Sequence, residues 1–157
     1  METMGSLIDK LTIEKIRFTK LSELAKSQSA VKRKVTLEKT AVVTEKVNDL
    51  KDEIDTYYYA LASGTMKGKV KDDKIKVYTN EKPSNLTDLR GFADVIDTLF
   101  SANLKLWELE DMRRDPIMPD PIRLNCADEV GKYNRIRNDC MDKINSMIHE
   151  SIYKKKG

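Results

Sequence analysis

Residues 7–24 read LIDKLTIEKIRFTKLSEL, and residues 95–112 read VIDTLFSANLKLWELEDM. A shift of 88 positions lays the first segment over the second, and a shift of 90 lays residues 48–54 over residues 138–144. Two pairs of matching segments in the same order predict a duplicated helical hairpin. Chance similarity between amphipathic helices is the alternative interpretation. Four positions of the first pair coincide: Ile8/Ile96, Asp9/Asp97, Leu11/Leu99 and Leu21/Leu109.

The composition favours an all-α protein. The chain has 157 residues, of which 39% are hydrophobic and 35% are charged, and it contains few glycines and prolines. A chain of this length is normally one domain and can bury a substantial core. This balance is typical of amphipathic helices whose outer faces are solvated. We therefore expect a single domain over residues 1–157.

The hydrophobic spacing divides the chain into two halves and a linker. Apolar residues recur every three or four positions in a first repeat, about 6–62, and in a second repeat, about 84–153. Ser6 is the expected cap of the first helix. Residues 65–78 alternate between apolar and polar, which predicts a β-hairpin in a linker of about 65–80. The predicted fold is an antiparallel four-helix bundle with a small β-hairpin inserted between the halves.

Charge and cysteine content exclude several classes of function. The net charge is only +3, and the lysine clusters fall in expected connections and at the end of the chain, where lysines are usually solvated. We expect neither a nucleic-acid partner nor a membrane. Cys126 and Cys140 have no metal-type spacing, so no zinc site is expected. There is no basic start followed by an apolar run, which predicts a cytoplasmic protein.

Three acids of the expected third helix could bind a metal ion. Asp97, Glu108 and Asp111 fall within roughly 60° of one another around a helix, at the border of the apolar face. Carboxylates spaced in this way are suitable ligands for Mg²⁺. The spacing of Glu108 and Asp111 is similar to one half of the metal motif of MazG-type nucleotide pyrophosphohydrolases. The paired glutamates of that motif have no counterpart here.

Asp9 and Asp97 have a simpler interpretation. Both lie near the beginning of an expected helix, where a carboxylate can accept hydrogen bonds from backbone N–H groups and complement the positive end of the helix dipole. We therefore predict the same capping role for both residues. Trp107 is expected in the core.

A polar face recurs in both halves and is a candidate interface. Asparagine has a poor propensity for helix interiors, so its presence there suggests specific hydrogen bonding, with drift on an exposed face as the alternative. Adjacent tyrosines near the end of the second helix cannot all face the core, which also indicates an interface. These features predict self-association, together with a protein or small-molecule ligand. The candidate residues are Asn48, Asp52, Asn134, Asn138, Asp142, Tyr58 and Tyr59.

Three segments together resemble an uncharacterised family of bacterial and phage helical proteins. These are the start at residues 7–13, the Lys-Leu-Trp-x-x-Glu-Asp type segment at residues 103–111 and the asparagine-rich helix at residues 134–144. The resemblance covers about a third of the chain. It implies an all-helical core and carries no assigned activity, and residues 65–78 are not part of it.

These observations predict a helical-bundle protein that acts by binding and assembly, with no catalytic residues and no cofactor. The resemblance adds that such a protein can be encoded by phages or mobile elements. The alternative is a Mg²⁺-dependent, MazG-like nucleotide pyrophosphohydrolase that uses Glu108 and Asp111, with Asp97 as a third ligand.

Overall fold

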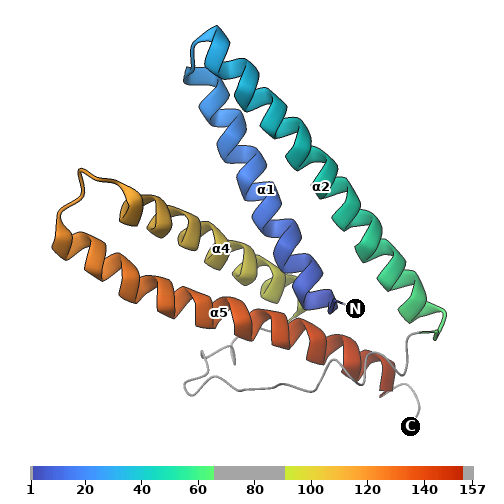
Figure 1. The fold of residues 1–157 in the computed structure, drawn as a ribbon. Helices are drawn as coiled ribbons and strands as arrows, with labels where there is room; N and C mark the ends of the chain where they lie inside the picture. The colour runs from blue at the N-terminus through green and yellow to red at the C-terminus, as the bar shows by residue number, and fades with distance from the viewer. Residues whose placement is uncertain (1, 66–90, 154–157) are drawn as a thin grey trace.

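The computed structural model describes residues 2–65 and 91–153. Four helices make up this part of the chain: α1 (Met4–Ser27), α2 (Ala30–Ala62), α4 (Phe92–Arg114) and α5 (Asp120–Tyr153). They form an all-α four-helix bundle in which α1 pairs with α2 and α4 pairs with α5 (Figure 1). The predicted class is therefore confirmed. The described residues contain no strand, and the expected β-hairpin lies, apart from Thr65, outside them.

The expected cap of the first helix was wrong. Thr3, not Ser6, caps α1, because its side chain accepts a hydrogen bond from the backbone N–H of Ser6 at 3.1 Å. Helix α2 begins at Ala30, before the charged segment that obscures its apolar period. Helix α4 begins at Phe92, after an extended Gly91, whereas the second repeat was expected to begin at about residue 84. Residues 84–90 lie outside the described residues. A cap such as Thr3 is not visible in the apolar spacing.

The turn between α1 and α2 is held by side chains of α2. Arg33 donates hydrogen bonds to the carbonyl oxygens of Ala25 at 2.9 Å and Gln28 at 3.2 Å. The last carbonyl groups of a helix have no partner within the helix, so these bonds cap the end of α1. The Thr36 hydroxyl is 2.6 Å from the Gln28 side-chain oxygen. The first hairpin, α1 and α2, is thus closed by polar contacts at its far end.

The main core lies where four helix ends meet: the beginnings of α1 and α4 and the ends of α2 and α5 (Figure 1). We call this region the junction. Leu99, Val95, Cys140 and Ile144 are fully buried there, as close packing of apolar side chains requires. The remaining buried members of the cluster are Met4, Leu7, Ile8 and Tyr57.

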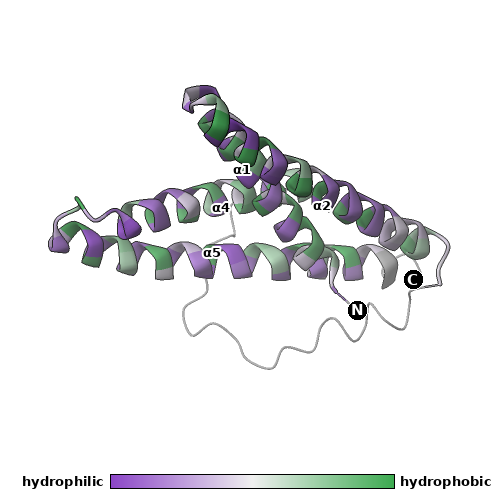
Figure 2. Cartoon of the chain, turned by 45° about the horizontal axis from the view of Figure 1, so that its top comes forward, coloured by the Kyte–Doolittle hydropathy of each residue, from purple (hydrophilic) through white to green (hydrophobic). Residues whose placement is uncertain are grey.

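Away from the junction, the two hairpins diverge (Figure 1). The distal half of the first hairpin, residues 15–39, which we call the first arm, buries only Ile16, Ala25 and Thr36. Hydrophobic residues are nevertheless spread along the whole length of both hairpins (Figure 2). The sequence therefore supplies more apolar surface than this single core covers.

The helix lengths agree with the predicted duplication. Helices α1 and α4 contain 24 and 23 residues, and α2 and α5 contain 33 and 34. The starts of α1 and α4 are 88 positions apart and those of α2 and α5 are 90 apart, the same two shifts that align the sequence segments. The duplication itself stays a prediction.

Candidate functional site

A polar cluster connects the two hairpins next to the junction. Arg137 of α5 donates two hydrogen bonds to the carboxylate of Asp9 in α1, from Nε to Oδ1 at 2.8 Å and from Nη2 to Oδ2 at 2.6 Å. The side-chain amide of Asn103 in α4 donates to Asp9 Oδ1 at 2.8 Å and to Thr12 Oγ1 at 2.7 Å. Thr12 in turn donates to the backbone carbonyl of Asp9 at 2.8 Å. Three helices therefore meet at one carboxylate.

The carboxylate of Asp9 is deeply buried, whereas the guanidinium of Arg137 reaches solvent. The exposed fraction of the side chain is 3% for Asp9 and 31% for Arg137. The hydrogen bonds from Arg137 to Asp9 raise the pKa of Arg137. Partial burial of Arg137 acts in the opposite direction, and the negative charge of Asp9 raises the pKa further. Burying a carboxylate costs free energy unless it is paired with an opposite charge and hydrogen-bonded. Here Arg137 supplies the opposite charge, and both oxygens of Asp9 accept hydrogen bonds. The cluster therefore links the hairpins in one defined register.

The predicted common capping role of Asp9 and Asp97 was wrong for Asp9. Its carboxylate binds Arg137 and Asn103, and the first turn of α1 is capped by Thr3 instead. Asp97 lies at the corresponding place of α4 but is exposed. The two aspartates that the duplication aligns therefore differ in environment.

A second contact joins the beginning of α1 to α5. The backbone N–H of Gly5 donates to the side-chain oxygen of Asn145 at 2.8 Å, which satisfies one of the free N–H groups of the first turn. A Cβ atom at Gly5 would stand 2.4 Å from the carbonyl oxygen of Met141. Only glycine allows the two backbones to approach this closely, so Gly5 and Asn145 place α1 against α5.

The cluster offers positioning rather than reaction chemistry. Both oxygens of Asp9 are engaged by Arg137 and Asn103, which holds the carboxylate in one orientation. Burial, with a contribution from nearby Asp139, raises the pKa of the Cys140 thiol to about 11. A thiol with this pKa stays protonated at neutral pH, and the thiolate is the nucleophilic form.

The predicted metal ligands lie on the outer side of α4. Asp97, Glu108 and Asp111 are all exposed. Within residues 2–65 and 91–153, no group of three or more His, Cys, Asp or Glu side chains is arranged to hold a metal ion. Trp107, expected in the core, is half-buried.

The predicted interface residues lie on α2 and α5 and differ in exposure. Asn48 and Asp52 are exposed on α2, and Tyr58 and Tyr59 are exposed near its end, where their rings meet edge to face with centroids 5.7 Å apart. On α5, Asn138 is exposed. The two other predicted residues of α5, Asn134 and Asp142, are half-buried.

The polar cluster draws two of its four residues from the second hairpin, α4 and α5, and the family comparison matches this same hairpin. Residues 93–157 match the family described as Protein of unknown function (DUF4254). The DUF4254 segment includes Asn103 and Arg137, while Asp9 and Thr12 lie outside it. No curated protein and no solved structure matches the chain. No helix among the described residues is long and apolar enough to cross a membrane.

Sequence reasoning missed Thr12, Asn103, Arg137, Gly5 and Asn145. One signal was available, because Asn103 and Arg137 both fall within the apolar arcs of their helices, beside Leu99 and Ile144 respectively. A polar residue in such a position needs a buried partner.

Proposed function

We propose that the protein acts by binding, as a subunit of a homo-oligomer, and carries out no reaction of its own. The observation that supports this proposal is the apolar surface of the first arm. Five large hydrophobic side chains are exposed there, against three buried residues, of which only Ile16 is large and apolar. The exposed side chains belong to Phe18, Leu24, Val31, Val35 and Leu37.

Single exposed hydrophobic residues are ordinary, but a group of them on one element marks an interaction surface. Val31 and Val35 lie one turn apart on α2, with 80% and 50% of their surface exposed. Leu24 lies at the end of α1 beside the same turn. Because the hairpins diverge, no other described helix covers this end of the molecule (Figure 1). A second polypeptide is the natural cover for such a surface.

The oligomeric mass tests this proposal. We expect light scattering coupled to size-exclusion chromatography to give at least a dimer at micromolar concentrations. The double variant Val31→Gln/Val35→Gln should weaken the association by about tenfold for each valine side chain removed from the interface, because each buried valine contributes about 1.5 kcal/mol. Leu124→Gln is the matched control, since Leu124 is 70% exposed but lies on α5. A native chain that stays monomeric at 100-fold higher protein concentration would overturn the proposal.

The polar residues predicted as an interface fit the same function in a secondary role. Asn48, Asp52 and Asn138 are exposed, as an interface rim requires, and so are Tyr58 and Tyr59. We propose them as contacts of a further partner or ligand on the sides of α2 and α5.

No contact of the described residues favours the alternative of a Mg²⁺-dependent pyrophosphohydrolase. Because Asp97, Glu108 and Asp111 are exposed and are not gathered around one point, we expect millimolar Mg²⁺ to leave the melting temperature unchanged within about 1 °C. A rise of several degrees that Glu108→Gln abolishes would show a real ion site and would revive the enzyme hypothesis.

A further inference from the structure

We infer that the partner is a second copy of this chain, and that the two copies exchange arms: the first arm of each lies against the acidic outer face of α4 in the other. This inference rests on the proposed function and specifies its interface. Three observations carry it: the charge of the first arm, the composition of the α4 face, and the divergence of the two hairpins.

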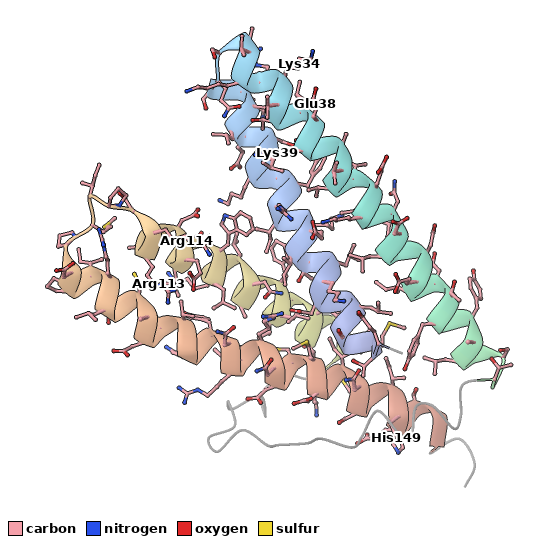
Figure 3. The ribbon with its side chains drawn as sticks, viewed as in Figure 1. Lys34, Glu38, Lys39, Arg113, Arg114 and His149 are labelled. Atoms are coloured by element: carbon pink, nitrogen blue, oxygen red, sulfur yellow. The ribbon has the colours of Figure 1, made fainter. Side chains whose placement is uncertain are left out.

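The first arm is strongly basic. Residues 15–39 contain eight lysines and arginines and two acids, a net charge of +6. Only Arg17 and Arg33 among these cations make an ion pair or hydrogen bond with the described residues. Lys26, Lys34 and Lys39 are exposed, and Figure 3 shows Lys34 and Lys39 on the distal part of α2. Six free cations at one end of a small protein create a long-range field.

The second hairpin has the opposite sign. Residues 91–153 contain eight lysines and arginines and twelve acids, a net charge of −4. Arg113 and Arg114, at the end of α4 in Figure 3, both approach Glu110, at 3.6 and 3.9 Å. Asp97, Glu108 and Asp111 make no ion pair with any described residue.

These three acids share their side of α4 with apolar side chains. At about 100° per residue, these three acids and three large apolar residues of α4 fall within about 100° around the helix. Phe100 is exposed, and Leu104 and Trp107 are half-buried. We call this surface the acidic face: Asp97, Phe100, Leu104, Trp107, Glu108 and Asp111. Like the first arm, the acidic face combines charged residues with large apolar side chains. The positive charge of the arm and the negative charge of the face are complementary.

Within one copy, these two surfaces cannot satisfy each other. The polar cluster at Asp9 fixes α1 against α4 and α5 near the junction, and beyond it the hairpins diverge (Figure 1). A two-fold related copy would bring each first arm to the other's acidic face. The same contact then occurs twice, which gives a closed dimer with no repeating surface left over.

A charge exchange between two variants tests this arrangement. The basic-arm variant is Lys26→Glu/Lys34→Glu/Lys39→Glu, and the acidic-face variant is Asp97→Lys/Glu108→Lys/Asp111→Lys. All six side chains are exposed, so both variants should fold. We expect each variant alone to be monomeric by light scattering at concentrations where the native chain is a dimer. An equimolar mixture should form a 1:1 dimer, because one of its two contacts is then native. The other contact places the three introduced glutamates, on an arm whose net charge is now 0, against the three introduced lysines.

The matched control reverses three exposed acids elsewhere: Glu45→Lys/Glu53→Lys/Asp55→Lys on α2. It makes the same change in net charge as the acidic-face variant and should leave the dimer intact. Circular dichroism would verify that all variants are helical. A native dimer that the acidic-face variant leaves undisturbed would overturn arm exchange but leave the proposed function standing. A monomeric native chain would overturn both. Failure of the two monomeric variants to associate on mixing would also overturn arm exchange.

Discussion

The Arg137→Met variant is expected to unfold with a free energy about 3–5 kcal/mol below that of the native chain. Its methionine keeps much of the apolar stem of arginine, but it removes both hydrogen bonds to Asp9. Asp9 is then left as a buried carboxylate with Asn103 as its remaining side-chain donor. An uncompensated buried charge is one of the few causes of so large a loss. Urea unfolding followed by circular dichroism would measure it.

The partner substitution should be milder. Asp9→Asn keeps a hydrogen-bonding side chain, and the guanidinium it leaves behind can turn to water because 31% of its side chain is exposed. We expect the double variant Asp9→Leu/Arg137→Met to recover much of the loss, since replacing both members of a buried pair by apolar residues is often close to neutral. A double-mutant cycle then compares Asp9→Leu, Arg137→Met and their double variant. Additive losses in it would show that the two side chains act independently, contrary to the structure.

Gly5→Ala should also destabilise the chain, by about 2 kcal/mol, although alanine is the better helix former. Its Cβ would lie 2.4 Å from the Met141 carbonyl oxygen, so α1 has to move away from α5 and the Gly5–Asn145 hydrogen bond lengthens. Overpacking of this kind costs about 1–3 kcal/mol or more, which exceeds the gain of about 1 kcal/mol in helix propensity. Thermal melting would detect the loss.

Gly131→Ala is the matched control for this prediction. Gly131 lies in the interior of α5, and a Cβ built on it meets no atom within 4 Å. The remaining effect is that alanine has a higher helix propensity than glycine, so this variant should be more stable than the native chain by about 0.5–1 kcal/mol. If both alanine variants changed stability in the same direction, the close approach of α1 to α5 would be contradicted.

The sequence predicted the helices and one part of the core well. The apolar period places Leu99, Cys140 and Ile144 on inner faces, and all three are fully buried at the junction. The same period also includes Phe18 and Leu24 of the first helix, yet both are exposed. Periodicity reports which side chains share a face, but it cannot report where two hairpins stop touching.

The candidate site was harder to predict, for a related reason. Asp9, Asn103 and Arg137 are separated by 94 and 34 positions, and only the packing of three helices brings them together. Each residue taken alone has an ordinary local explanation, such as the first-turn role expected for Asp9. A carboxylate and a guanidinium within apolar stretches of different helices were the available clue, because each needs an opposite charge when buried. The apolar pattern does not say which helix carries that opposite charge, because this depends on how the helices pack against one another.

The length of the first hairpin beyond the junction also affects how the molecule can deform. Eighteen residues separate Asp9 from Ser27 at the end of α1, about 27 Å at 1.5 Å per residue. A rotation of about 10° around Asp9 would displace that end by about 5 Å. The hydrogen bonds of Asp9 thus set the orientation of the whole first hairpin, so that a small tilt of α1 at Asp9 moves the far end of α1 by several ångströms.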